Sequence, residues 1–95
     1  MGERPPIRSG LSSLRKIIIK SLTENQILLL NEIEKNSTKT ITSLINKLSK
    51  SAKVPLSTLK LNSRTLKEME LIDYSNFQPV ILSDSGKLVL ELIRC

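Results

Sequence analysis

The chain has 95 residues, of which 39% are apolar and 2% aromatic, and its formal net charge is +6. This length and composition predict a single domain with a core of Leu, Ile and Val. The one cysteine is the last residue, Cys95, which excludes a disulfide within the chain and favours a reducing compartment. The apolar runs are too short to span a bilayer and the first ten residues hold no apolar signal core, so we expect a soluble, cytoplasmic protein without membrane contact.

The first elements are a basic arm and two helices. Residues 1–10 combine Gly, Pro and Arg without periodicity and predict a flexible basic arm, for which an inert tail is the alternative. Residues 11–22 repeat apolar side chains at spacings of three and four and predict a helix, although three adjacent isoleucines also suit a strand. Thr23 and Gln26 have the spacing of a capping box, so a second helix is expected over 23–36.

The centre of the chain is predicted to hold two more helices. Residues 38–41 are β-branched and polar, and predict a short extended pairing segment. A helix follows over 42–52, and a proline at position 55 marks the turn before another over 56–69. The predicted inner face of this last helix consists of Leu59, Leu66 and Met69. Its basic residues are spaced by four and three, and share another face: Lys60, Arg64 and Lys67.

Positive charge is concentrated in this central region. Between Lys35 and Lys67 there are eight Lys or Arg residues and no Asp or Glu. The flanks are acidic, with a net charge of −2 over 21–38 and −3 over 68–95. Charge placed in this way, inside a segment with helical periodicity, indicates a surface for a polyanion. The alternative is a lysine-rich surface that is only solvated.

The last elements are a hairpin and a helix. Two β-prone runs separated by a polar connection predict a hairpin over 71–82. Ser83 and Asp84 suit the start of a final helix over 83–94. The apolar faces of the two terminal helices are either ordinary core or, because a small domain has limited surface to cover both, the interface of a homodimer. We expect the dimer, through Leu14, Ile18, Leu88, Val89, Leu92 and Ile93.

This order of elements, with a basic helix followed at once by a hairpin, resembles the winged helix-turn-helix DNA-binding family of bacterial and archaeal transcription regulators. The resemblance covers roughly residues 23–93. Residues 56–72, LSTLKLNSRTLKEMELI, are similar to the family's recognition helix and the beginning of its wing, and residues 82–87, LSDSGK, to its L-T/S-x-x-G start of the next helix. The resemblance implies a mainly α fold with a small β-hairpin (α+β), an extra N-terminal helix and a C-terminal helix.

The resemblance also implies a function, which is sequence-specific binding of double-stranded DNA with the helix over 56–69 in the major groove. Groove-facing positions are then Ser57, Thr58, Lys60, Leu61 and Arg64, with Lys67 on the same basic helix. Arg64 would contact guanine or hold a phosphate. The resemblance further implies that Lys47, Lys50 and Lys53 bind phosphates near the turn. The wing tip would consist of Asn76, Phe77 and Gln78.

The chain departs from the family pattern in four places. The interval between Leu48 and Leu59 is longer than in the compact motif, and Glu70 stands where the family often has glycine. Leu61 is apolar on the side expected to face DNA, and the wing has no Lys or Arg. The last two features support a competing hypothesis, in which the third helix of a winged-helix module docks on a protein. RNA binding is less favoured because aromatic stacking platforms are almost absent.

Catalysis and cofactors are not expected. The chain has no histidine, no metal-ligand cluster and no phosphate-binding Gly-rich loop. The spacing Ser-x-x-Lys, which some hydrolases use, occurs at Ser13/Lys16 and Ser57/Lys60. In a chain this rich in serine and lysine, that spacing arises easily by chance.

Overall fold

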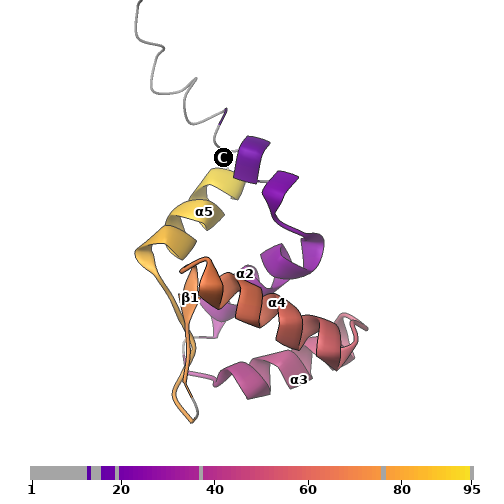
Figure 1. The fold of residues 1–95 in the computed structure, drawn as a ribbon. Coiled ribbons are helices and arrows are strands. Elements are labelled where there is room, and N and C mark those ends of the chain that lie inside the picture. The colour runs from indigo at the N-terminus through magenta and orange to yellow at the C-terminus, as the bar shows by residue number, and fades with distance from the viewer. Residues whose placement is uncertain (1–12, 14–15, 19, 37, 76, 95) are drawn as a thin grey trace, which may run out of the picture.

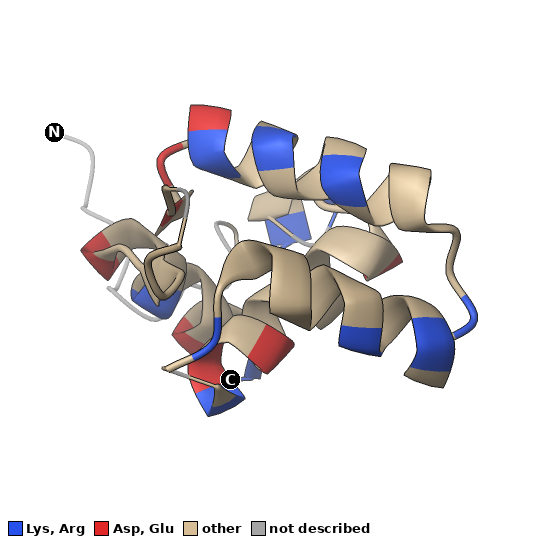
Figure 2. Cartoon of the chain, turned by 90° about the horizontal axis from the view of Figure 1, so that it is seen from below, with Lys and Arg blue, Asp and Glu red and all other residues tan. Residues whose placement is uncertain are grey.

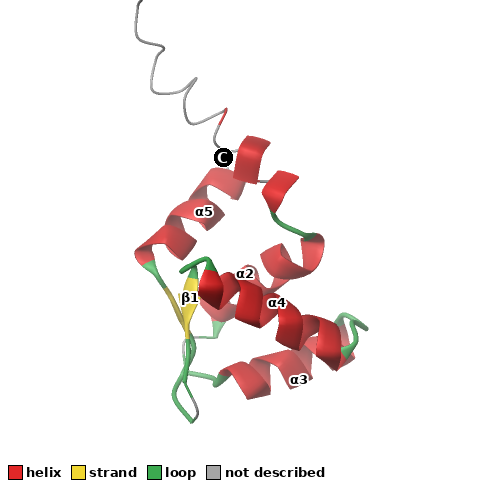
Figure 3. Ribbon diagram, viewed as in Figure 1, coloured by secondary structure: helices red, strands yellow, loops and turns green. Residues whose placement is uncertain are grey.

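The structure is a computed structural model that describes residues 13, 16–18, 20–36, 38–75 and 77–94. Its elements are α2 (Glu24–Lys35), α3 (Ile41–Ser51), α4 (Leu56–Glu68), β1 (Ile72–Asp73), β2 (Ile81–Leu82) and α5 (Asp84–Arg94) (Figure 1). The described residues between 13 and 21 are also helical. Figure 3 shows one short hairpin at the edge of the group of helices, and its two strands are antiparallel. The predicted mainly α fold with a small hairpin, arranged like a winged helix, is confirmed.

Helix α2 is central to the packing. It begins with the predicted capping box, in which the Gln26 N–H donates to Thr23 Oγ1 (3.2 Å) and the Thr23 N–H donates to Gln26 Oε1 (3.0 Å). Its buried residues Leu29, Leu30 and Ile33 belong to the core cluster. Through them α2 packs against α3, α4, β2 and α5. The remaining elements are therefore held in place by one well-capped helix.

The segment before α3 joins the wing to the helices. Thr40 forms an isolated antiparallel bridge with Pro79, and the Val80 N–H donates to Lys39 O (3.0 Å). Of the pairing segment predicted over 38–41, Lys39 and Thr40 pair with the second half of the hairpin. Ile41 is instead the first residue of α3, because the N-cap at Thr40 starts the helix there. The Thr40 hydroxyl then accepts from the Ser43 N–H (3.3 Å) as N-cap of α3. The wing is consequently fixed to the beginning of α3.

The longer interval between the two central helices is taken up by residues 52–55. Helix α3 buries Leu44, Ile45 and Leu48 and ends at Ser51. The Ser49 hydroxyl donates to Val54 O (2.7 Å), and Lys53 has a φ of 55°, in the left-handed region. The connection therefore makes a defined turn into α4.

The prediction that Met69 lies in the core is wrong, because its side chain is 45% exposed. Helix α4 ends at Glu68, and Glu70 takes a φ of 62°. The Glu70 N–H donates to Lys67 O (2.9 Å) and the Leu71 N–H donates to Leu66 O (3.0 Å). This is a Schellman motif, which brings Leu71 onto Leu66 in place of Met69. The position that the winged-helix family often fills with glycine is here a left-handed glutamate.

Replacing Glu70 by glycine is expected to stabilise the fold by about 1 kcal/mol. A left-handed conformation costs a non-glycine residue roughly 1–2 kcal/mol, and the larger unfolded-state entropy of glycine offsets part of the gain. The urea midpoint should rise accordingly. In the matched control Glu68→Gly, glycine replaces the last residue of α4 and should lower stability by up to about 1 kcal/mol, which is its cost in a helix interior. Equal destabilisation by both changes would contradict the Schellman assignment.

Helix α5 is tied to α2 at its C-terminal end. The Arg94 guanidinium donates to both Glu34 carboxylate oxygens (2.6 and 3.1 Å) and to Asn31 Oδ1 (2.7 Å). These hydrogen bonds lower the pKa of Glu34 from its ordinary value and raise that of Arg94. Glu34 of α2 and Arg94 at the end of α5 thus lie together, on elements other than the basic α4.

Candidate nucleic-acid interface

The exposed side of α4 carries a row of basic residues. Leu59, Ser63 and Leu66 form the buried stripe of this helix. Lys60, Arg64 and Lys67 each follow one of these by a single residue, which places them about 100° around the helix. All three are exposed, and the row is visible along the upper helix in Figure 2. The sequence prediction that these residues share a face distinct from the core is confirmed.

Lys60 and Arg64 have no partner of opposite charge among the residues that the structure describes. The ion pairs present among the described residues are Lys47–Glu32 and Arg94–Glu34, and neither involves α4. Helix α4 also has no acidic residue before its last position, Glu68. Two full positive charges are therefore available on one side of this helix.

Lys67 makes contacts within the chain. Its Nζ donates to Tyr74 O (2.7 Å) and lies 4.5 Å from the centroid of the Tyr74 ring. Such a cation–π contact contributes about 0.5–1 kcal/mol at an exposed site. Lys67 therefore connects the last turn of α4 to the wing just after β1. Its predicted DNA contact stays a prediction, but the structure adds a positioning role.

The basic residues of α3 and the turn are three exposed lysines, one of which lies beside an acidic residue of α2. Lys47 Nζ lies 4.0 Å from the Glu32 carboxylate of α2. Lys50 is exposed on α3, and Lys53 is exposed in the turn. Asn46, one residue before Lys47, lies instead on the side of α3 that faces α4. Of the three predicted phosphate-binding lysines, Lys47 is thus directed to α2.

A hollow of about 510 Å³ is lined by residues of both α3 and α4, beside the place where the two helices pack. Polar residues from three elements line it, and they are Thr42 and Asn46 of α3, Lys60 and Arg64 of α4, and Tyr74 beside β1. Ile41, Ile45, Leu56 and Ser63 complete its lining, and none of the lining residues is acidic. Sequence reasoning missed Thr42, Asn46 and Tyr74. Thr42 and Asn46 are four residues apart on a helix and so share a face, and this spacing could have identified them from the sequence.

The wing tip presents an apolar side chain. Phe77 is 94% exposed and has a φ of 65°, and Gln78 is exposed beside it. Asn76, the other predicted wing residue, lies outside the described residues. A second hollow, lined by Thr40, Thr42, Tyr74, Ser75, Phe77 and Ile41, shares three residues with the first. The two hollows therefore adjoin along the start of α3.

The remaining predicted groove-facing residues lie along α4. Ser57 is exposed, Thr58 is half-buried, and Leu61 is 63% exposed. Ser57 and Leu61 are four residues apart, so they share one face. Leu61 thus places an apolar side chain among polar ones on the exposed surface of α4.

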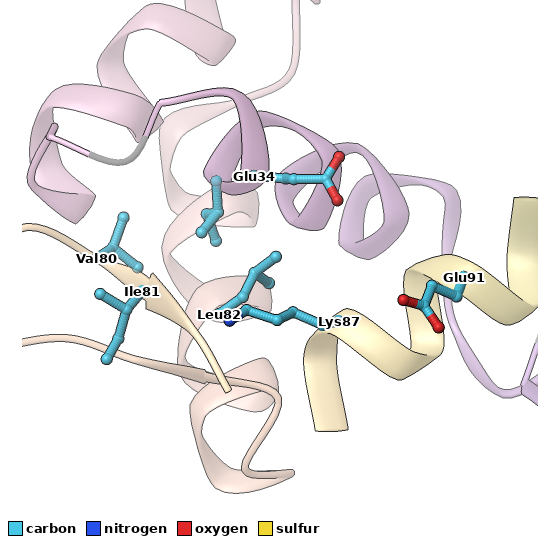
Figure 4. A pocket seen from close by; sticks show the side chains of 7 residues that line it. Glu34, Val80, Ile81, Leu82, Lys87 and Glu91 are labelled. Atoms are coloured by element: carbon cyan, nitrogen blue, oxygen red, sulfur yellow. The ribbon is translucent and has the colours of Figure 1, made fainter. Parts of the chain in front are cut away.

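A different hollow lies between α2, β2 and α5 (Figure 4). Glu34, Lys87 and Glu91 surround apolar residues that include Ile33, Val80 and Leu82. Its charge is mixed, unlike that of the hollow beside α4. Over the part of the chain that the structure describes, no group of three metal-ligating side chains is found, and no helix has the length and apolar character needed to cross a bilayer.

The residues predicted to form a dimer interface differ in exposure. Leu88 is 53% exposed, whereas Leu92 is only 5% exposed in a single chain. Ile18, Val89 and Ile93 are partly buried and pack against the core. Leu14 lies outside the described residues. Leu88 is therefore the member of the set that offers most surface to a partner, and the dimer stays a prediction.

No family model, curated protein or solved structure matches the chain. The function must therefore be argued from the geometry and charge of the α4 surface.

Proposed function

We propose that this chain binds double-stranded DNA in a sequence-specific manner and acts as a transcription regulator. The observation that carries the proposal is the exposed side of α4, where Lys60 and Arg64 have no acidic partner among the described residues. Helix α4 has 13 residues and is therefore about 20 Å long. An α-helix fits the major groove of B-DNA, and the arrangement of α3, α4 and the hairpin leaves this side of α4 uncovered.

Different residues of α4 provide the affinity for DNA and the specificity for its sequence. Lys60 and Arg64 provide charge for the phosphate backbone, which binds all sequences alike. Leu61 and Ser57 share the exposed face at another angle, and contact base edges. A leucine suits the methyl group of thymine, and a serine hydroxyl bonds to a donor or an acceptor. Leu61 is thus a specificity residue in this proposal.

The distribution of charge over the other elements also favours an orientation in which α4 faces the DNA. Glu32 and Glu34 lie on α2 and Glu91 on α5, while α3 and the first twelve residues of α4 contain no acid. A polyanion approaching the molecule is attracted to the α3–α4 side, where Lys60 and Arg64 have no acidic partner among the described residues. The charge asymmetry therefore steers DNA to α4 before any specific contact forms.

A homodimer would match a two-fold symmetric DNA site. Leu88 of α5 and Ile17 of the N-terminal helical segment are both more than half exposed, and are the apolar residues that such an interface would use first. The proposed dimer thus pairs terminal helices and leaves both copies of α4 uncovered.

The direct test is selection of duplexes from a random pool at near-physiological salt. We expect a defined motif to be enriched, and an inverted repeat within it would report the dimer. Single-stranded DNA of the selected sequence should bind more weakly than the duplex. Weak binding without any enriched motif would contradict sequence-specific recognition.

A second candidate function is docking on a protein through the same helix. Leu61 is 63% exposed, Phe77 is 94% exposed, and the wing has no Lys or Arg. In this case the parent chain should capture one stoichiometric protein partner, the Leu61→Ser variant should lose it, and duplex binding should stay sequence-blind. If a DNA motif is recovered and the Leu61→Ser variant selects a different motif, α4 binds DNA and the protein-docking function is rejected.

A further inference from the structure

The hollow between α3 and α4 brings together side-chain donors that have no acceptor within the described part of the chain. Thr42 and Tyr74 carry hydroxyls, Asn46 an amide, Lys60 an ammonium and Arg64 a guanidinium. Side-chain hydrogen bonds are present nearby, such as Ser63 Oγ to Lys60 O (2.8 Å) and Lys67 Nζ to Tyr74 O (2.7 Å). Within the described ranges, none of them uses the five donor groups. The hollow is therefore equipped to bind an acceptor-rich group.

The charge of the hollow specifies the ligand class further. Two full positive charges line it, no acidic residue does, and the Lys67 ammonium lies over the Tyr74 ring. A phosphodiester has one negative charge and oxygens that only accept hydrogen bonds, so it complements this lining. The apolar residues Ile41, Ile45 and Leu56 complete the lining and add no negative charge to the site.

We infer that this hollow binds one phosphate of the DNA backbone, held by Thr42 and Asn46 from α3, Lys60 and Arg64 from α4, and Tyr74 from the wing. The inference rests on the proposed function and deepens it. Three separate elements contribute to one phosphate site, so the site fixes the register of α4 on the duplex. Lys67 is a positioning residue that holds Tyr74 against the end of α4.

This assignment separates the two roles left open for Arg64. A residue that reads guanine changes the preferred sequence when it is removed, whereas a residue that holds a phosphate weakens binding to all sequences alike. In the hollow, Arg64 takes the second role. Sequence reading then falls to Ser57 and Leu61 on the outer side of the helix.

The test uses an isosteric charge change inside the hollow and the same change outside it. Asn46→Asp places a carboxylate against the phosphate, whereas Asn62→Asp adds the same charge on α4 at a residue that does not line the hollow. Affinities are measured for the selected duplex and for a scrambled one, over a range of salt concentrations. Circular dichroism and urea unfolding of both variants establish that they are folded.

We expect Asn46→Asp to lose at least about tenfold more affinity than Asn62→Asp, equally for both duplexes, with a salt slope smaller by about 1. Thr42→Val, which removes only a hydroxyl, should lose severalfold. A scan of single methylphosphonates should find one phosphate whose neutralisation weakens the parent but not Asn46→Asp. Equal losses in the two Asp variants, with the parent still binding duplex, would overturn this inference alone. Failure of the parent to bind duplex would overturn the proposed function itself.

Discussion

Replacing Lys60 and Arg64 together by alanine is expected to weaken duplex binding by about 100-fold at near-physiological salt. Hydrogen bonds to charged groups contribute about 1.5–3 kcal/mol each, and every 1.4 kcal/mol is a factor of ten in affinity. Neither residue has a competing ion pair among the described residues, so their charges are not already neutralised within the chain. The dependence of log K on log salt should become less steep by about 2, because two counterions fewer are released.

The matched control removes the same charge elsewhere. Lys16 and Lys20 are exposed in the N-terminal helical segment, so Lys16→Ala with Lys20→Ala lowers the net charge equally without touching α4. This control should lose several times less affinity. If both double variants lose the same affinity, net charge alone drives binding and α4 has no special part. Unchanged binding of the Lys60/Arg64 variant at every salt concentration would reject α4 as the recognition helix.

Features decided by neighbouring residues were predictable from the sequence. The capping box of α2 depends on Thr23 and Gln26 three positions apart, and its two hydrogen bonds form as expected. The basic row on α4 follows from helical period alone, since Lys60, Arg64 and Lys67 are spaced by four and three. Both results need only local geometry, which the order of residues specifies.

Features decided by where the chain turns were not predictable in the same way. Helical period places Met69 on the inner face of α4, but the helix stops at Glu68 and the Schellman motif at Glu70 puts Leu71 in the core. A glutamate gives no signal for a left-handed residue, because glycine is what usually marks one. The exposure of Met69 therefore follows from the backbone conformation of Glu70, which the identity of that side chain does not predict.

The composition of the hollow depended on contacts between distant segments. Asn46 and Arg64 line one hollow only because α3 packs against α4, and Tyr74 joins the lining because the wing bridges back to Thr40 through Pro79. Lys47 likewise appears free in the sequence, and meets Glu32 only in the folded chain. Helical period and residue spacing predict which face of a helix a residue is on, whereas tertiary packing determines which residues that face contacts.

Gly86, in the first turn of α5, lies against the backbone of the turn that follows α4. A Cβ added there would lie 2.1 Å from Leu71 O and 3.1 Å from the Leu82 side chain. Leu71 O also accepts a hydrogen bond from the Ser83 N–H (3.0 Å), and the Ser83 hydroxyl donates to Glu70 O (2.6 Å). The closest obstacle is thus backbone, held by bonds that also join α5 to the turn after α4. It cannot rotate aside as a flexible side chain would.

Gly86→Ala is therefore expected to destabilise the fold by about 3 kcal/mol or more, because overpacking against fixed backbone forces α5 away from β1 and breaks these bonds. In a domain of this size that lowers the melting temperature by roughly 10–20 °C. Helix propensity predicts the opposite sign, since alanine in a helix is about 1 kcal/mol better than glycine. The control Ser85→Ala, at the exposed neighbouring position, should leave stability nearly unchanged. A Gly86→Ala variant as stable as the parent would mean that α5 does not approach Leu71 this closely, and that the match to the family's glycine at this position has no packing role.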